Sequence, residues 1–286
     1  MILIDGKQTA QTVRAQIRKD AAEAVARYGD AITLAVILVG DNPASKTYVA
    51  NKIKACAEVG YLSRHITLPA DCTEEEVLRE IEALNRDSAV NGILLQLPLP
   101  PQCNETRLLA AIDPAKDVDG LHVVQRGRLF CGLPALLPCT PYGVMTLLST
   151  YDIDPAGKRA VVIGRSNLVG KPLAILLLNT NATVTVCHSR TEGLAAVCRE
   201  ADILISAVGK PRFVTADMVK EGATVIDVGI NRDEQGRLVG DVDFDAVAPK
   251  CAYITPVPGG VGPMTVTMLM RNTLTAYVAQ HEGELK

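Results

Sequence analysis

The chain has 286 residues, 48% of them hydrophobic, which is enough for about two domains with substantial cores. Only 3% of the residues are aromatic and tryptophan is absent, which favours aliphatic cores like those of buried parallel sheets. The net charge of −3, without a basic run, gives no support to nucleic-acid binding. No apolar run approaches the ~18 residues of a membrane span. The start, MILIDGKQTA, lacks the pattern of a secretory signal.

The eight cysteines are scattered, with no CxxC pair and no histidine at metal-ligand spacing. Several lie within apolar strings, where cysteine usually packs as a small hydrophobic residue. We interpret them as free thiols in a reducing cytoplasm, and we expect no metal site.

The first part of the chain alternates between helical and strand patterns. Helices are predicted over 9–29, 45–60 and 72–87, and strands over 32–40, 63–69 and 90–100. In the third helix, Thr73 is the expected N-cap and Glu76 completes a capping box. This alternation indicates a mostly parallel sheet and an α/β fold.

The second predicted helix contains the stretch SKTYVANKIK, with one tyrosine and three lysines. Ser45, Tyr48 and Lys52 are spaced i, i+3 and i+7, so a turn of about 100° per residue places them along one polar edge. A tyrosine and a lysine four residues apart are also common on an ordinary solvated helix. Periodicity therefore identifies Lys52 as the candidate functional lysine, but it does not establish a catalytic role.

The same periodicity predicts an apolar stripe on this helix, formed by Val49, Ile53 and Ala57. Lys46 falls at the N-terminal end of that stripe, and Lys54 points about 160° away from Lys52 by helical phase. We interpret both as surface charges.

Three further features suggest ligand binding. Gln96 is the polar residue of the strand GILLQLPLP, near its proline stop, and ligands of α/β sheets bind at carboxyl ends of strands. The loop KDVDG carries two acids before Gly120. In TPVPGGVGPMT the prolines make the backbone rigid and the glycines allow unusual φ and ψ angles, which suits close approach by a flat ligand. The alternatives are a glutamine bonded to loop backbone, turn-capping aspartates and a domain hinge.

Residues 113–141 read as irregular, proline-spaced chain, and we place a domain boundary there. A second alternating series begins near Lys158. Strands are predicted at 158–164, 182–189, 202–209 and 224–230, and helices at 170–181, 193–201, 215–222 and 265–281.

The second series opens with AVVIGRSNLVGKPLAILLL, a strand, a glycine turn and a helix. Such a turn lets backbone N–H groups meet a pyrophosphate at a helix N-terminus. The run from Gly164 to Gly170 departs from the usual GxGxxG, because Ser166 replaces the second glycine and the spacing is one residue longer. A purely structural turn is the alternative reading.

The next strand ends in CHSRT and lacks the acidic residue that enzymes using NAD place there for the ribose. It offers Ser189 and Arg190 instead, and Arg165 lies in the glycine turn. A cation and a hydroxyl at this place suit a ribose 2′-phosphate and favour NADP, although either arginine could be a solvated surface charge.

These segments together resemble the bifunctional methylenetetrahydrofolate dehydrogenase/methenyltetrahydrofolate cyclohydrolase family. The resemblance is carried along nearly the whole chain by DNPASKTYVANKIKACAEVG, GILLQLPLP, PAKDVDG, PCTPYGVMTLL, VVIGRSNLVGKP and TPVPGGVGPMT. It implies two α/β domains flanking a cleft, the second a Rossmann-like dinucleotide-binding domain. The expected division is 1–120, completed by the C-terminal helix 265–286, and 121–264.

The resemblance also implies the chemistry. NADP accepts a hydride from 5,10-methylenetetrahydrofolate, and water then opens the methenyl product to 10-formyltetrahydrofolate. A cytoplasmic homodimer formed through the dinucleotide domain is implied, with a place in one-carbon metabolism and purine biosynthesis.

Matched residue by residue to this sequence, the family motifs imply three sets of functional positions. The catalytic set is Lys52, Gln96, Tyr48 and Asp119, and the substrate-binding set adds Ser45, Gly259 and Gly260. The cofactor set is Gly164, Arg165, Ser166, Ser189 and Ile230, to which we add Arg190 from the reasoning on the 2′-phosphate.

Three alternatives stay open at this point. A short-chain dehydrogenase also uses Tyr-x-x-x-Lys, but its glycine turn precedes that pair, whereas here the order is reversed. A monofunctional member that lacks cyclohydrolase activity and a non-enzymatic dinucleotide sensor are the other two. Formation and decay of the methenyl product distinguish all of these from the bifunctional enzyme.

Overall fold

The computed structural model describes residues 1–285, apart from the side chain of residue 44. The chain forms two compact units. The three-strand unit comprises Thr12–Cys139 and Val266–Lys286, and the six-strand unit comprises Met1–Gln11 and Thr140–Thr265. Helices α1 (Gly6–Tyr28) and α10 (Val261–Glu282) each contribute residues to both units.

The divisions fall at residues 139/140 and 265/266. The second lies next to the boundary expected at 264, whereas the first lies after residue 120 but within the segment 113–141, and Met1–Gln11 joins the six-strand unit. The N-terminal strand β1 (Ile2–Leu3) pairs in parallel with β11 (Cys251–Ile254), which places the start of the chain in the six-strand unit. In the other unit, the Asn272 side chain of α10 donates hydrogen bonds to the carbonyl oxygens of Val118 and Leu137. The Asn272 side chain therefore links segments on both sides of the boundary expected at residue 120 to α10.

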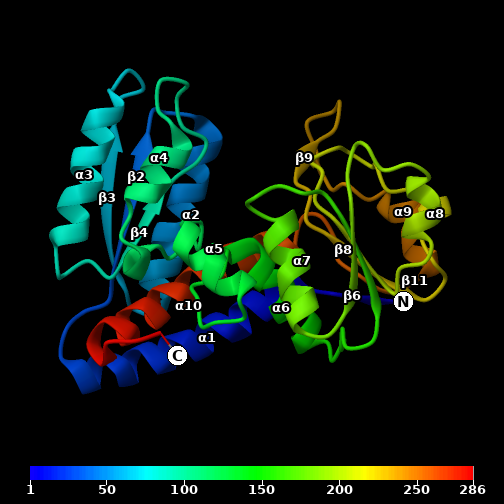
Figure 1. Cartoon of the computed structure of the whole chain (residues 1–286), viewed down its shortest axis with the longest axis horizontal. Coiled ribbons are helices and arrows are strands. Elements are labelled where there is room, and N and C mark those ends of the chain that lie inside the picture. Colours follow the sequence, from blue (N-terminus) through cyan, green and yellow to red (C-terminus); the bar gives the residue numbers. More distant parts are fainter. Residues whose placement is uncertain (286) are drawn as a thin grey trace. The chain divides into compact units, whose positions relative to one another are not determined.

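The three-strand unit contains a parallel sheet with the order β3-β2-β4, and Figure 1 shows helices running alongside it. The strands are β2 (Thr33–Val39), β3 (Leu62–Leu68) and β4 (Gly92–Leu95), and the helices are α2 (Pro43–Val59), α3 (Glu74–Arg86) and α4 (Glu105–Ala111). Alternate side chains of a strand point to opposite faces. Ala35, Ile37 and Val39 of β2 accordingly share one core cluster with the apolar residues of α3 and α4.

The predicted cap of α3 is confirmed. The backbone N–H of Glu76 donates to the Thr73 hydroxyl, and the Glu76 carboxylate accepts from the Thr73 backbone N–H. Two orphan backbone donors are thereby satisfied at the start of this helix.

The prediction of irregular chain over residues 113–141 was wrong in part. Helix α5 (Val123–Phe130) lies within this segment, and α6 (Cys139–Thr150) begins at its end. His122 caps α5, because its Nδ1 accepts from the Val124 backbone N–H. Pro141 falls in the first turn of α6, where a missing N–H costs no helical hydrogen bond.

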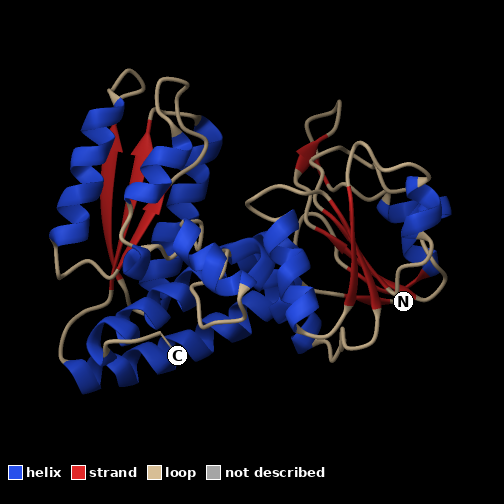
Figure 2. Ribbon diagram, in the orientation of Figure 1, coloured by secondary structure: helices blue, strands red, loops and turns tan. Residues whose placement is uncertain are grey.

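The six-strand unit contains a parallel sheet with the order β1-β11-β8-β7-β5-β6. Figure 2 shows its strands in red. The remaining bounds are β5 (Arg159–Ile163), β6 (Thr183–Cys187), β7 (Ile203–Ser206), β8 (Ala223–Asp227), α7 (Gly170–Asn179), α8 (Leu194–Cys198) and α9 (Phe244–Val247). A small antiparallel pair, β9 (Asn231–Arg232) with β10 (Leu238–Val239), is added to the unit. The short helix predicted over 215–222 is only a 3-10 turn at Ala216–Met218.

Strand order identifies the ligand-binding edge of this sheet. After β5, the chain adds β6 on one side of it and then β7 on the other. At such a switch point the two connections diverge and leave a crevice outside the carboxyl ends of the strands. Open α/β sheets bind their ligands there. The mixed α/β fold with a Rossmann-like parallel sheet agrees with the predicted fold class.

None of the helices in residues 1–285 combines the length and apolar character needed to cross a membrane. The eight cysteines are free thiols, as predicted, and all but Cys131 are buried.

Candidate functional site

Lys52 and Gln96 meet in the three-strand unit. Lys52 lies in the middle of α2, and its Nζ donates a 2.8 Å hydrogen bond to Oε1 of Gln96. Gln96 directly follows β4 and is 8% exposed. Its Nε2 donates to the carbonyl oxygen of Leu97 at 2.6 Å, which fixes the amide orientation and turns the oxygen toward the lysine.

The surroundings of Lys52 make its amine easier to deprotonate. Burial lowers the pKa of the Lys52 ammonium, because desolvation penalises its charged form. The negative charge of Asp119 opposes that shift. Gln96 orients the amine without adding a charge of its own.

The helical pattern predicted for α2 needs correction. Ile53 is 38% exposed and Ala57 is exposed, so the expected apolar stripe is wrong beyond Val49. The buried face instead carries Ser45 and Val49, with half-buried Lys52. A lysine can occupy such a face because its methylene stem packs as apolar surface while its amine finds a polar partner.

The other residues singled out on this helix differ in exposure. Tyr48 is 45% exposed, so nearly half of its surface is open to solvent. Ser45 is buried, and its backbone N–H donates to Oδ1 of Asn42. Lys46 is exposed and pairs with Asp41 at 3.5 Å, and Lys54 is also exposed, as expected for surface charges.

Asp119 lies in the loop KDVDG, whose geometry is fixed by the residues before it. Lys116 is buried and donates from Nζ to the carbonyl oxygens at the end of α3, those of residues 84, 85 and 87. Asp117 is buried and accepts from the His122 backbone N–H at 2.7 Å, and burial raises its pKa to about 6. Asp119 itself is half-buried, and its carboxylate hydrogen-bonds to the Cys139 thiol.

The sequence analysis gave no role to two further residues near Asp119. Gly120 has φ +69°, and a Cβ there would come within 2.5 Å of the Leu137 carbonyl carbon, so only glycine fits. Cys139 is buried beside Asp119, donates from Sγ to the Val118 carbonyl oxygen, and has a pKa raised well above normal by burial. The only sequence signal for Cys139 was its position between two prolines.

In the six-strand unit, the glycine turn follows β5 at the switch point. Gly164 has φ +123°, and a Cβ there would meet the Ala207 carbonyl oxygen at 2.4 Å. A Cβ at Gly170, where α7 begins, would meet the Gly164 carbonyl oxygen at 2.2 Å. Both positions need glycine, which argues for a turn built for close backbone approach.

Ser166 has a local role within this turn. Its hydroxyl accepts from the backbone N–H groups of Val169 and Gly170, at 3.1 and 3.4 Å. Arg165 is exposed beside it, and the neighbouring β6 ends in a turn where Ser189 and Arg190 are also exposed. The cations predicted to face a 2′-phosphate are therefore open to solvent at the carboxyl ends of β5 and β6.

Ile230 follows β8 and is 47% exposed. Gly259 and Gly260 precede α10 in the same unit, and their carbonyl oxygens approach the start of α1 closely. The Gly259 oxygen accepts from the Lys7 backbone N–H at 3.0 Å, and a Cβ at Gly6 would clash with the Gly260 oxygen. These two glycines thus belong to a different unit from the Lys52–Gln96 pair.

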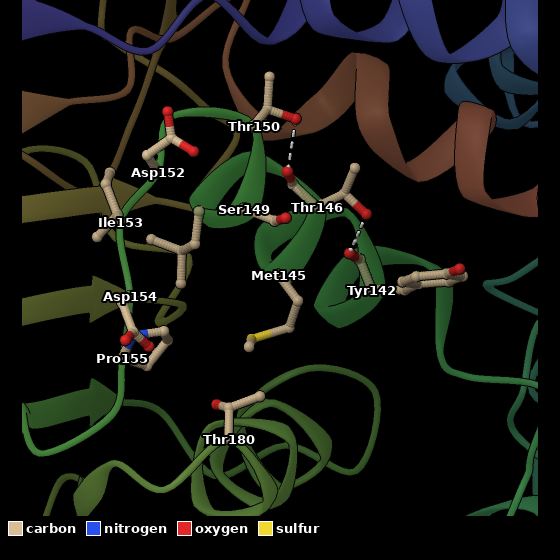
Figure 3. Close-up of a pocket in the computed structure, with 11 residues that line it drawn as sticks. Tyr142, Met145, Thr146, Ser149, Thr150, Asp152, Ile153, Asp154, Pro155 and Thr180 are labelled. Carbon is tan, nitrogen blue, oxygen red and sulfur yellow. Dashed lines mark hydrogen bonds between the residues drawn. The ribbon is translucent and has the colours of Figure 1, made fainter.

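A cavity of about 640 Å³ lies elsewhere in the six-strand unit. Figure 3 shows its lining between α6 and the chain leading into β5, with Met145, Ile153 and Thr180 among the residues that form it. None of the predicted site residues lines it. It lies next to the amino end of β5, opposite the edge where parallel sheets bind ligands.

Family comparisons agree with this division of the site. The model of the tetrahydrofolate dehydrogenase/cyclohydrolase catalytic domain matches residues 4–119, and that of the NAD(P)-binding domain matches residues 138–281. Bifunctional protein FolD of Enterococcus faecalis is 56% identical over 278 residues, covering 97% of this chain and 99% of that protein.

Two solved structures are similar over the same extent. The bifunctional enzyme FolD of Campylobacter jejuni has a TM-score of 0.96 and 49% identity, covering 98% of this chain and 99% of that one. The Trypanosoma brucei dehydrogenase-cyclohydrolase, complexed with NADP cofactor and inhibitor, has a TM-score of 0.94 and 42% identity, with 98% of both chains covered. The chain therefore belongs to the tetrahydrofolate dehydrogenase/cyclohydrolase family.

Proposed function

We propose that the Lys52–Gln96 pair carries the hydrolytic half of a bifunctional, NADP-dependent folate enzyme. The enzyme oxidises 5,10-methylenetetrahydrofolate to 5,10-methenyltetrahydrofolate and hydrolyses that product to 10-formyltetrahydrofolate. The observation that carries the assignment is the 2.8 Å hydrogen bond from Lys52 Nζ to the oriented oxygen of Gln96, on a lysine whose pKa is lowered by burial.

Hydrolysis requires a group that accepts a proton and then returns it. Water adds to the methenyl carbon and loses one proton to a base. The hydroxyl of this adduct then releases its proton to solvent as the formyl C=O forms, and the bond from that carbon to N5 of the folate breaks as N5 takes up a proton. A neutral Lys52 amine can accept the first proton and donate it back to N5. A lowered pKa suits this role, because the amine must be unprotonated when water attacks.

The oxidation step makes a smaller demand on side chains. Bound NADP⁺ supplies the hydride acceptor, and the adjacent folate nitrogen stabilises the cation that remains. Lys52 and Tyr48 then contribute mainly by holding the folate in place, because correct orientation of the reacting carbons is the main requirement.

The residues of the six-strand unit fit a dinucleotide phosphate. The turn from Gly164 to Gly170 leaves no room for a Cβ at either end, because the backbone of Ala207 and of Gly164 lies there. A tight turn of this kind before a helix brings backbone N–H groups to a pyrophosphate in dinucleotide-binding folds. Exposed Arg165, Ser189 and Arg190 supply cations and a hydroxyl for the 2′-phosphate, and Ile230 supplies an apolar contact. We assign this set, with Ser166 shaping the turn, to the cofactor.

The folate assignments follow the family motifs. Tyr48 is suited to stack on the aminobenzoate ring because nearly half of its surface is exposed, and Asp119 is assigned to the pterin. Ser45 completes the set on α2, and Gly259 and Gly260 are assigned to the substrate as backbone. On this reading, 1–120 with 265–286 is the folate domain and 121–264 the dinucleotide domain.

We further propose a cytoplasmic homodimer formed through the dinucleotide domain, with no nucleic-acid partner. The net charge of −3 without a basic run supports the last point. The product, 10-formyltetrahydrofolate, places the enzyme in one-carbon metabolism and among the suppliers of purine biosynthesis.

The decisive variant is Lys52→Met, which keeps the apolar stem and removes the amine. We expect decay of added methenyltetrahydrofolate to fall to the spontaneous rate, a loss of at least about 1000-fold. Reduction of NADP⁺ by methylenetetrahydrofolate should stay measurable. Absorbance of the methenyl compound and of NADPH records both reactions.

Lys54→Met is the matched control, because Lys54 is exposed on the same helix. Both of its activities should equal those of the wild type. Equal loss of both activities in Lys52→Met would contradict the division of roles, and undiminished hydrolysis would contradict the assignment of Lys52 itself.

A further inference from the structure

Two carboxylates are buried at the carboxyl edge of the larger sheet. Asp227 ends β8 and is 3% exposed, and Asp241 follows β10 and is 0% exposed. Neither belongs to the catalytic or cofactor sets above. Burying a carboxylate is costly unless hydrogen bonds replace its water, so the donors around these two groups are informative.

Asp241 is satisfied by five donors, which come from the end of β7, the residues that follow it, and the start of β9. Its Oδ2 accepts from Ser206 Oγ and the backbone N–H groups of Val208 and Gly209, at 3.1, 2.7 and 3.2 Å, and its Oδ1 accepts from the Lys210 backbone N–H and Asn231 Nδ2, both at 2.9 Å. One side chain thus fixes three consecutive amides after β7 and the residue that follows Ile230.

Asp227 in turn holds the segment that carries Asp241. Its carboxylate accepts from the backbone N–H groups of Gly229, Asp241 and Val242, at 2.9, 2.9 and 2.8 Å. A Cβ at Gly240 would lie 1.8 Å from Asp227 Oδ2, and one at Gly229 would lie 2.1 Å from Asp241 Oδ1. Both carboxylates can therefore approach the backbone only because glycines stand opposite them.

The loop that Asp241 fixes lies at the switch point of the sheet. Ala207 begins it, donates from its backbone N–H to the Ile163 carbonyl oxygen at the end of β5, and directs its own oxygen at Gly164. The β7 loop, Ala207–Lys210, therefore lies beside the glycine turn at the switch point, where open α/β sheets bind their ligands.

We propose that Asp241 is a positioning residue for NADP, acting through the loop Val208–Lys210 and through Asn231. The inference rests on the proposed function. Without the carboxylate, four backbone and side-chain N–H donors and a hydroxyl would face each other in a buried space, and the loops beside Gly164 and Ile230 would have to separate. The charge of Asp241 thereby shapes the crevice without touching the cofactor.

The test is Asp241→Asn, which keeps the shape of the side chain. Whichever way the amide is turned, its NH₂ group replaces an oxygen that accepts from at least two donors. We expect the Kd for NADP⁺, titrated by calorimetry, and the KM for NADP⁺ to rise at least tenfold. Hydrolysis of methenyltetrahydrofolate, assayed without NADP⁺, should stay within threefold of the wild type.

Asp243→Asn is the matched control in the same segment. Asp243 is half-buried at the start of α9, where its side chain makes no capping hydrogen bond, and its loss should leave the NADP⁺ Kd unchanged. A Kd in Asp241→Asn within twofold of the wild type would overturn the proposal. So would a parallel loss of NADP⁺ binding and hydrolysis, because it would indicate general destabilisation.

If Asp241→Asn does not fold, Asn231→Ala takes its place, because it removes a single donor from Oδ1. A Kd raised at least threefold with hydrolysis intact supports the proposal, and an unchanged Kd overturns it. Failure of the proposed function is a separate outcome, since it would show as a wild-type enzyme without methenyl formation or decay.

Discussion

At the scale of single residues, the partner of Lys52 decides what its amine can do. Burial lowers the lysine pKa, and an acidic partner would restore the charge by stabilising the ammonium. Gln96 offers a hydrogen-bond acceptor of the same shape with no net charge, and Leu97 fixes its orientation. We therefore expect hydrolysis to require a neutral residue at position 96.

Gln96→Glu tests that requirement. The new carboxylate should raise the pKa of Lys52, so the fraction of neutral amine falls at pH 7. We expect hydrolysis of methenyltetrahydrofolate to fall at least about 100-fold at pH 7. Activity should recover as the pH rises, which shifts the pH–rate profile to the alkaline side.

The control for this charge is Gln102→Glu. Gln102 is exposed and donates to the carbonyl oxygens of Ala70 and Cys72, away from the lysine. Its variant should keep the wild-type pH profile. A Gln96→Glu enzyme with normal hydrolysis at pH 7 would refute the argument from neutrality.

At the scale of elements, the turn between β5 and α7 joins conformation to binding. Gly164 combines a positive φ with an Ala207 oxygen only 2.4 Å from the place that a Cβ would occupy, so any side chain must move the β7 loop. This glycine turn is one residue longer than GxGxxG. Ser166 stabilises the longer turn, because its hydroxyl accepts a hydrogen bond from the Val169 backbone N–H. We therefore expect binding at this turn to depend on its shape.

Gly164→Ala should therefore impair the dinucleotide reaction selectively. We expect the KM for NADP⁺ to rise more than tenfold, while hydrolysis assayed without cofactor stays within threefold of the wild type. Gly127→Ala is the control, because its Cβ would meet no atom within 4 Å and its φ is ordinary. That helix substitution should leave both activities unchanged, and an unchanged KM in Gly164→Ala would count against the cofactor assignment.

At the scale of the whole molecule, the two units have separate cores. One core cluster joins residues of β2, β4, α3 and α4, and the other joins residues of β5, β7, β8 and β11. The proposed cofactor residues all belong to the unit with the second cluster. A ligand stabilises the structure that binds it, so NADP⁺ should act unequally on the two units.

Hydrogen exchange followed by mass spectrometry measures this inequality. At 100 times its Kd, NADP⁺ contributes about 2.7 kcal/mol, so amides that exchange by opening of the six-strand unit should slow by up to roughly 100-fold. Amides of β2 and β4 should slow much less. Gly164→Ala at the same NADP⁺ concentration should show little protection, and protection confined to the three-strand unit would contradict the assignment.

Much of the architecture was determined locally and could be predicted. Strands β2, β5 and β8 are continuous apolar runs, and the capping box of α3 is encoded in four residues, so both follow from sequence pattern alone. Lys52 and Gln96 were selected because one shares a helical edge with polar residues and the other interrupts an apolar strand. The family motifs then supplied the chemistry, since no spacing in the sequence encodes a folate.

The tertiary structure decided what depends on contacts between distant residues. Burial of the Lys52 face of α2 could not be read from periodicity, because the lysine is accommodated there by Gln96, 44 residues away. Pairing of β1 with β11 and the five donors around Asp241 likewise join segments that are far apart in the chain. Local pattern fixes an element and its faces, whereas the partner that makes a buried charge tolerable is chosen only when the chain is folded.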